Sequence, residues 1–147
     1  MKKLSYKGKT VVPYIDMYAE NYNIYMGFKL MDKGSLSPYC DVTVNLVDFA
    51  PLIGCIDINN EPKIFDFLIK NGFCEDLKQK KYSGFAEYPV VVFNKEKMLE
   101  IDRYMIIRHL YCKEEDIFGF DIEETFEKVR AMSNEELDNW FASSRYA

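Results

Sequence analysis

The densest group of oxygen-bearing side chains precedes an apolar run, in the stretch GCIDINNEPKIFDFLIKNG. If Asp57 opened a calcium-binding loop, Asn59 and Glu61 would occupy its third and fifth positions. The sixth position requires a glycine with positive φ and is Pro62, and the twelfth requires a bidentate carboxylate and is Leu68. The sequence therefore predicts a capped helix start here, and no metal site.

A second group with reactive side chains is the pair His109 and Cys112, three residues apart on one predicted helix. That spacing permits contact, as a base and a nucleophile would need. Cys112, however, falls near the carboxyl end of the helix, where the helix dipole and the acidic residues 114–116 disfavour a thiolate. We interpret both side chains as structural. The chain also lacks GxSxG, P-loop, GxGxxG and HExxH patterns, so we expect no catalytic residue and no cofactor.

Acidic side chains gather in the last quarter of the chain. The net charge is −5, and residues 113–139 carry ten acidic and three basic side chains. Displayed on two short helices, these carboxylates could imitate a phosphate backbone and occupy a basic groove of a nucleic-acid-handling protein. The alternative is a solvated polar face. The candidate partner-binding residues are Glu114, Glu115, Asp116, Glu123, Glu124 and Glu127.

Basic and aromatic side chains alternate in the stretch KQKKYSGFAEY, residues 78–88, which we interpret as beginning in a polar loop. This composition suits a modest surface for single-stranded nucleic acid, made by Lys80, Lys81, Tyr82 and Tyr88. Affinity for nucleic acid depends on many phosphate contacts, however, and the chain is net acidic. We therefore expect no direct nucleic-acid binding, and we expect the aromatic side chains to face the core.

Strands are predicted over residues 2–6 and 9–18, on either side of a Lys7-Gly8 turn, and over residues 24–30, 40–46 and 85–93. Residues 40–46 alternate apolar and polar side chains with a period of two. Residues 31–39 are predicted as a turn and residues 75–84 as a polar loop. Pro89 places the start of the last strand at a sheet edge or a bulge. Helices are predicted over residues 62–71, capped by Asn60 and ended by Gly72, and from Asn94 to Cys112. Two short helices follow. The predicted class is α+β, a single domain with an antiparallel sheet of about five strands packed by two helices.

The chain divides into a predicted core, residues 1–112, and an acidic helical extension packed on it, residues 113–147. The amino-terminal lysines are not followed by an apolar region, and no 18 apolar residues run together. The four cysteines form no CxxC pair, as is usual for buried thiols. We expect a cytoplasmic protein with no membrane partner.

Three blocks in this order, CDVTVNL, GCIDINNEPKIFDFLIKNGF and YSGFAEYPVVVF, resemble an uncharacterised family of small bacterial domains. In that family a T-V-N-L strand precedes a D-x-N-N helix start and an S-G-F-x-x-Y-P strand. The resemblance covers about residues 2–102 and implies an α+β domain encoded on conjugative and other mobile elements. It brings no catalytic residues and implies an accessory protein, of a kind that often antagonises host defences.

We therefore expect a non-enzymatic protein-interaction module, an accessory factor of a mobile element whose acidic helices inhibit a nucleic-acid-handling host protein. Either these helices or the strand edge at Pro89 would meet the partner. Two alternatives stay open: a small enzyme or ligand-binding domain with a pocket near His109, and a weak single-strand binder using residues 78–88.

Overall fold

Two Lys-Gly dipeptides turn the chain into a first antiparallel sheet. Lys7 and Gly8, and likewise Lys33 and Gly34, all have positive φ, as two-residue hairpin turns of the type I′ class require. The computed structural model describes the backbone of residues 1–118 and 129–142, and the side chains of residues 1–113 and 129–142. The strands lie in the order β1 (Leu4–Tyr6), β2 (Lys9–Met17), β3 (Ile24–Asp32) and β4 (Ser35–Asp41).

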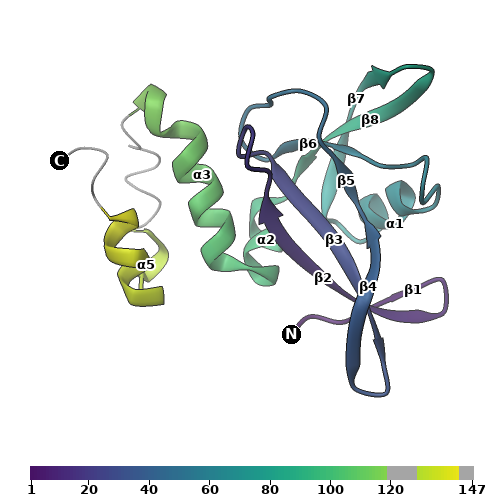
Figure 1. Ribbon diagram of the computed structural model, residues 1–147, viewed down its shortest axis with the longest axis horizontal. Helices are drawn as coiled ribbons and strands as arrows, with labels where there is room; N and C mark the ends of the chain where they lie inside the picture. Colours follow the sequence, from purple (N-terminus) through teal and green to yellow (C-terminus); the bar gives the residue numbers. More distant parts are fainter. Residues whose placement is uncertain (119–128, 143–147) are drawn as a thin grey trace.

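A second antiparallel sheet contains the remaining strands. Its order is β5 (Thr43–Val44), β6 (Ile53–Ile56), β8 (Ala86–Phe93) and β7 (Cys74–Ser83), so β7 lies at the edge. Val42 connects the two sheets, because its N–H donates to Met26 O of β3 at 2.8 Å and its carbonyl accepts from Asp57 N at 2.9 Å. Figure 1 shows the two sheets meeting at this point, with the β7–β8 hairpin projecting away from it.

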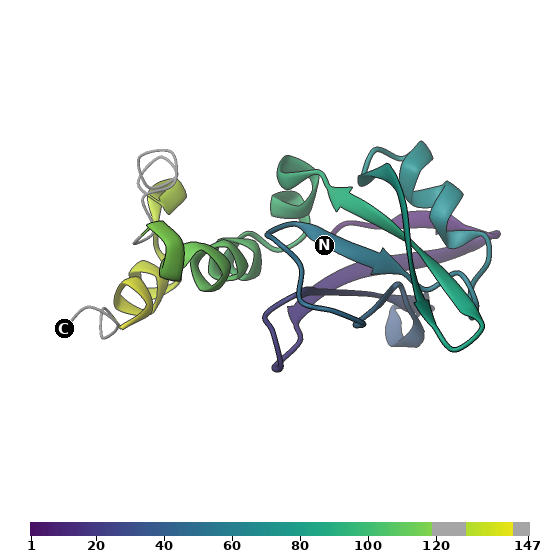
Figure 2. The same cartoon turned by 90° about the horizontal axis from the view of Figure 1, so that it is seen from above.

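Four helices accompany the sheets in the described part of the chain. They are α1 (Ile64–Lys70), α2 (Lys95–Ile101), α3 (Arg103–Phe118) and α5 (Asn134–Phe141). Helix α1 packs near β7, whereas α3 lies on the other side of the strands with α5 beyond it (Figures 1 and 2). None of these described helices is long and apolar enough to cross a membrane.

One buried cluster joins both sheets to the helices. Its largest fully buried side chains include Phe28 and Met26 of the first sheet, Ile64 and Leu68 of α1, and Ile107 of α3. The cluster is continuous from sheet to helices, so the α+β class and the single domain are confirmed. The strands, expected as one sheet of about five, are divided into two four-stranded sheets.

The first helix starts later than the sequence indicates. Asn60 is not its N-cap, because both the N–H and the side-chain amide of Asn60 donate to the carboxylate of Asp57, forming a turn before the helix. The cap position is Lys63. The predicted end is confirmed: Gly72 has φ of 78°, and Phe73 N donates to Leu68 O at 3.0 Å, as in a Schellman motif.

The second predicted helix is divided at Asp102. Asn94 is confirmed as its N-cap, since its side chain accepts from Lys97 N at 2.8 Å. Asp102 leaves the helical conformation, and its carboxylate accepts from Met105 N, which starts α3. Helix α3 continues to Phe118, across the predicted boundary after residue 112.

The segment EDLKQKKYSG, predicted as a loop, is most of β7. Its polar composition is that of an edge strand, with a bulge between Asp76 and Gln79. The stretch around Pro38, predicted as a turn, is strand β4. Pro89 lies in β8, which pairs with β6 only over Val90–Val92, so at Pro89 the strand is paired with β7 alone.

The carboxyl-terminal helix α5 is one of the two short helices predicted after residue 112. The other predicted short helix falls mainly on residues 119–128, outside the described part of the chain.

Candidate functional site

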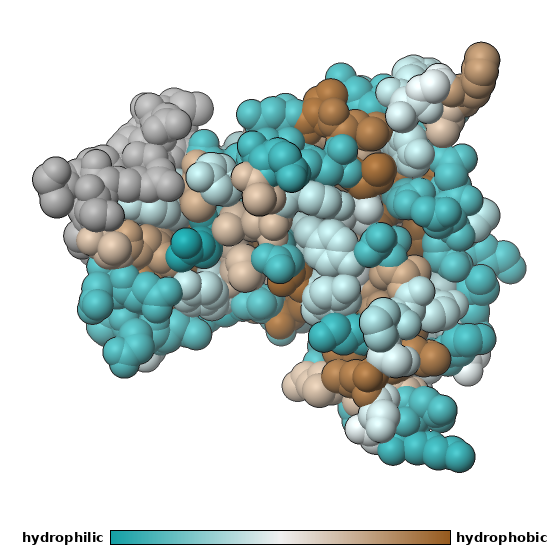
Figure 3. Space-filling view, in the orientation of Figure 1, coloured by the Kyte–Doolittle hydropathy of each residue, from teal (hydrophilic) through white to brown (hydrophobic). Residues whose placement is uncertain are grey.

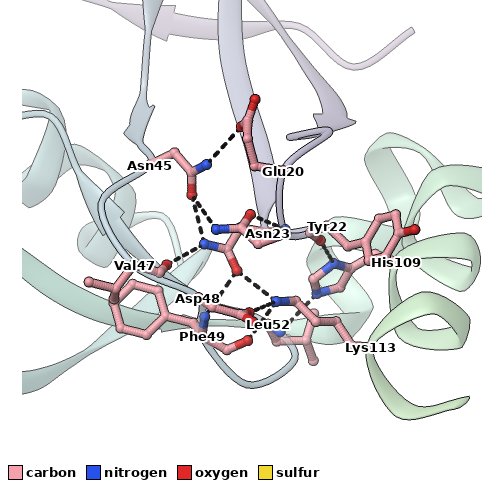
Figure 4. A network of polar contacts seen from close by, with 11 residues as sticks. Glu20, Tyr22, Asn23, Asn45, Val47, Asp48, Phe49, Leu52, His109 and Lys113 are labelled. Carbon is pink, nitrogen blue, oxygen red and sulfur yellow. Dashed lines mark hydrogen bonds and ion pairs between the residues drawn. The ribbon is translucent and has the colours of Figure 1, made fainter. Parts of the chain in front are cut away.

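His109 lies at the contact between α3 and two loops, and it is fully buried. Its Nδ1 donates to the carbonyl of Tyr22, in the turn between β2 and β3, at 2.7 Å. Its Nε2 accepts from the N–H of Leu52, just before β6, at 3.0 Å. Figure 4 shows the ring between these two backbone groups. One tautomer, with the proton on Nδ1, satisfies both contacts.

These contacts leave the His109 ring without a nitrogen that could act on a substrate. Burial lowers the pKa of the ring to about 4, so it is neutral at physiological pH. A general base needs a nitrogen within hydrogen-bond reach of the proton it removes, and both nitrogens are occupied by backbone groups. The geometry therefore gives His109 a structural role, holding α3 to two loops.

Lys113 extends this contact by one helical turn. Its ammonium group donates to Asn23 Oδ1, Asp48 Oδ1 and Phe49 O, each at 2.7 Å, and its side chain is 6% exposed. All three protons of the ammonium group thus have acceptors, as a buried lysine requires. The contacts tie α3 to the loop that precedes β6 (Figure 4).

Asn23 is the centre of the network. Its amide group donates to Asn45 Oδ1 at 2.8 Å and to Val47 O at 2.7 Å, and its oxygen accepts from Phe49 N and Lys113. Every hydrogen-bonding position of this buried side chain is therefore used. A hollow of about 450 Å³ lies beside the network, lined in part by Cys112 and Lys113. We interpret the network as the set of contacts that holds the loops containing Asn23 and Asp48 against α3.

The oxygen-rich stretch before α1 is likewise used internally. The carboxylate of Asp57 binds Asn60, and Glu61 accepts from Tyr6 Oη at 2.7 Å and from Lys7 Nζ at 3.0 Å. The hydrogen bond from Tyr6 lowers the pKa of Glu61. Within the described residues, no group of three or more His, Cys, Asp or Glu side chains could hold a metal ion.

Three of the four thiols offer little nucleophilic character. Burial raises the pKa of Cys40 and of Cys55 to about 11, and that of Cys74 to about 12. These three thiols are therefore protonated near neutral pH and behave as small apolar side chains. No disulfide joins the four cysteines.

The candidate acidic residues fall partly outside what the structure describes. Glu114, Glu115 and Asp116 belong to the carboxyl-terminal half of α3. The other three, Glu123, Glu124 and Glu127, lie outside the described residues.

The candidate basic and aromatic residues lie on the β7–β8 hairpin, and the strands divide them between two faces. Lys80 is opposite Pro89 and Tyr82 is opposite Glu87, whereas Lys81 is opposite Tyr88. Because neighbouring residues of a strand point to opposite faces, Lys80 and Tyr82 share one face while Lys81 and Tyr88 share the other. The structure therefore does not bring these four side chains together. Lys80 also forms an ion pair with Glu87 at 2.8 Å.

Sequence reasoning missed the most exposed aromatic side chain of this hairpin. Phe85 is fully exposed, with a relative accessibility of 107%, and Tyr82 is 65% exposed, so the expectation that these rings face the core is wrong. Gly84 and Phe85 form a two-residue turn in which only Gly84 has positive φ, as in a type II′ turn. The Gly84-Phe85 pair, with glycine at the first central position of a two-residue turn, is the sequence signal that could have placed Phe85 at a tip.

Two hollows lie side by side where β7 faces α1. One, of about 400 Å³, is lined by residues that include Ile58, Phe65 and Pro89. The other, of about 640 Å³, is lined by residues that include Ile69 and Gly72. Both share walls made by Asp76 and Lys78 at the bulge of β7. Phe65 and Ile69 are four residues apart, on one face of α1, so the two hollows follow the same helix face.

Residues 14–117 match a family described as a domain of unknown function, DUF4313. The match begins within β2 and includes most of α3, so it reaches further along the chain than the resemblance noted in the sequence, which ends near residue 102. No curated protein matches the chain. No solved structure matches it either.

Proposed function

The chain belongs to the DUF4313 family, and we propose that it is a non-enzymatic protein-interaction module that binds an extended segment of a partner protein along β7. The observation that carries the proposal is the edge strand β7, ten residues long, with hollows between it and α1. The structural roles of His109 and Lys113 support a non-enzymatic role, because the single histidine of the chain has both ring nitrogens bonded to the backbone.

The edge of β7 presents unpaired backbone groups. Ser83 and Ala86 close the two-residue turn, and a pair in that position is hydrogen-bonded. Hydrogen-bonded and non-hydrogen-bonded pairs alternate along antiparallel strands, so the N–H groups of Lys80 and Tyr82 point away from β8. Pro89, which has no N–H, lies opposite Lys80 in agreement with this alternation. An added strand could pair with these outward groups.

The hollows supply places for side chains of the added strand. Alternate side chains of an extended segment point to one face of the sheet, here toward α1. The hollow bordered by Ile58, Phe65 and Pro89 would accept an apolar side chain. The two hollows lie next to one another along β7, so one segment could use both.

The charges of β7 indicate what kind of segment fits. Lys78, Lys80 and Lys81 lie within four consecutive residues of the strand, and only Lys80 is paired with Glu87. A second copy of β7 would bring lysines near lysines, which disfavours self-pairing. A segment with an apolar side chain flanked by acidic residues would instead complement the strand.

A pair of substitutions at one position tests this proposal. Lys80→Pro removes the outward N–H of the edge and the charge, whereas the control Lys80→Ala removes only the charge. We expect peptides selected from a random displayed library on the wild-type protein to bind Lys80→Ala and to lose at least about tenfold in affinity for Lys80→Pro. Far-UV circular dichroism would establish that both variants keep the wild-type fold. Selected peptides that bind all three proteins equally would refute strand addition.

We further propose that the protein is a cytoplasmic accessory factor of a mobile element, and that its acidic extension gives it a second surface for a basic host protein. The ten acidic residues among residues 113–139 support the charge part of this proposal. The mobile-element part rests on the resemblance of the three sequence blocks, and neighbouring genes would test it. If binding to a basic protein does not weaken as salt is raised, and is unchanged when Glu123, Glu124 and Glu127 are replaced by lysine, the acidic surface is refuted.

A further inference from the structure

We propose that the tip of the β7–β8 hairpin binds the surface of an anionic lipid bilayer, with Phe85 inserted among the headgroups. This surface shares Lys80 and Lys81 with the β7 edge but adds Phe85 at the turn, and it does not depend on partner binding at that edge. The chain was expected to have no membrane partner because it lacks a spanning segment, but a spanning segment is not needed for contact with a membrane surface.

The tip places an apolar ring at the outermost point of a stiff element. Phe85 is fully exposed and occupies the second position of a two-residue turn whose first position, Gly84, has φ of 62°. Eight pairs of residues hold the two strands of the hairpin together. Figure 3 shows apolar atoms projecting from the body of the molecule at this end. A phenylalanine that is already exposed at the tip of a paired hairpin can enter a bilayer surface without local unfolding of the protein.

Behind the tip, side chains occur in the order that a membrane interface favours. Counting back along β7 from Ser83, which closes the turn, the next residues are Tyr82, then Lys81, then Lys80. At a rise of roughly 3.3 Å per residue, Tyr82 lies about 3 Å behind the closing pair and the two lysines about 7 and 10 Å behind it. Tyrosine favours the headgroup level, and lysine side chains reach toward phosphates.

These spacings agree with the depth to which apolar groups enter a bilayer surface. An interfacial element buries its apolar part by roughly 5–10 Å at the boundary of headgroups and acyl chains. If Phe85 enters to that depth, the ammonium groups of Lys80 and Lys81 lie at the level of the phosphates. The division of these lysines between the two faces of the hairpin is then favourable, because a tip inserted from above meets headgroups on both faces.

The charge of the whole molecule would orient it on such a surface. The half of the hairpin nearer the tip carries Lys78, Lys80 and Lys81 together with Glu87, which is paired with Lys80, whereas Glu75 and Asp76 lie at the base of the hairpin. Helices α3 and α5 lie at the opposite end of the molecule (Figures 1 and 2). Residues 113–139 carry ten acidic and three basic side chains, and the described parts of this stretch, in α3 and α5, thus lie away from an anionic membrane when the hairpin meets it.

A fluid bilayer fits this tip better than single-stranded nucleic acid. Stacking of successive bases needs aromatic faces grouped on one platform, whereas Phe85 is at the turn and Tyr82 and Tyr88 point to opposite faces. Insertion into a bilayer requires no preformed pocket for the ring. The experiment below therefore also measures binding of single-stranded nucleic acid, as the competing result.

Sedimentation with lipid vesicles tests the proposal on the full chain. The probes are vesicles of phosphatidylcholine alone and vesicles of phosphatidylcholine mixed with phosphatidylglycerol. We expect the protein to partition onto the mixed vesicles and to dissociate as salt is raised. Phe85→Ser should weaken partitioning by about tenfold or more, and Phe85→Trp should retain it. Leu36→Ser, which removes a partly exposed apolar side chain at the tip of the β3–β4 hairpin, is the matched control and should partition as the wild type does.

Two results would overturn the proposal. The first is partitioning of Phe85→Ser onto mixed vesicles equal to that of the wild type. The second is no partitioning of the wild type onto vesicles, and wild-type binding of a fluorescent single-stranded oligonucleotide that is lost in Phe85→Ser would then assign the tip to nucleic acid. The Phe85→Ser variant separates the two proposals, because it should lose partitioning onto mixed vesicles while still binding the peptides selected for the β7 edge.

Discussion

The buried imidazole predicts a measurable acid sensitivity of folding. In the unfolded chain His109 has its ordinary pKa of 6.5, whereas in the folded protein burial lowers the pKa to about 4. Below pH 6.5 the unfolded chain therefore binds a proton that the folded protein does not. The stability contributed by the neutral ring is full above pH 6.5 and is lost as pH falls toward 4. Proton linkage with these two pKa values lowers the free energy of unfolding by about 2 kcal/mol between about pH 7.5 and pH 5.

The substitution that isolates this effect is His109→Gln. Glutamine can make one of the two backbone contacts of the ring but does not titrate, so the variant should be less stable by roughly 1–3 kcal/mol at neutral pH. The stability difference between wild type and variant should then narrow by about 2 kcal/mol between about pH 7.5 and pH 5. Carboxylates elsewhere titrate in both proteins, and their contribution cancels in the difference.

Urea unfolding followed by circular dichroism, repeated across this pH range, measures the effect. A stability difference that stays constant with pH would refute the assignment of a buried neutral ring. The chain contains one histidine, so proton NMR also reports directly on it. The ring signals should not titrate near pH 6.5, and a midpoint close to that value would contradict the reasoning in the same way.

Two further substitutions probe the packing around this region and the first sheet. Lys113→Met should lower the free energy of unfolding by about 2–4 kcal/mol, because the acceptors of Asn23 and Phe49 lose their buried donor; urea unfolding unchanged from the wild type would show that those contacts are not formed. Gly27→Ala should lower the free energy of unfolding by about 1–3 kcal/mol, because the added Cβ would lie 2.8 Å from the ring of Tyr14 and against the hydroxyl of Tyr25. Combining it with Tyr25→Phe should cost less than the sum of the two single changes, and simple additivity in thermal unfolding would contradict the proposed clash.

Local sequence signals correctly identified the places where the chain changes direction. The Lys7-Gly8 turn, the Asn94 cap and the Gly72 helix end are all present, because each depends on the conformational freedom or hydrogen-bonding capacity of one or two residues. These features need no information from distant parts of the chain.

Local signals failed where two nearby groups compete for the same donor. The carboxylate of Asp57 binds Asn60, so the helix begins later than the cap pattern indicates. The carboxylate of Asp102 binds Met105 N and divides one predicted helix into two. The sequence contains both members of each pair but does not say which hydrogen bond prevails.

The candidate site required still more distant information. The polar segment that becomes β7 has no apolar alternation, and it is a strand only because β8 pairs with it. That pairing separated Lys80 and Tyr82 from Lys81 and Tyr88, which the sequence had grouped as one surface. It also placed Phe85 at an exposed tip.

The sequence by itself determined the class of the protein, the Asn94 cap, the Lys7-Gly8 turn, the helix end at Gly72 and the absence of the common catalytic motifs, because these follow from composition and short-range patterns. Only the tertiary structure decided that the single histidine is a structural group and that the exposed chemistry lies on the β7–β8 hairpin. His109 meets Tyr22 and Leu52, which are 87 and 57 residues away along the chain. Contacts over such separations form only when sheets and helices bury their apolar faces together, and that packing assigns each polar group its partner.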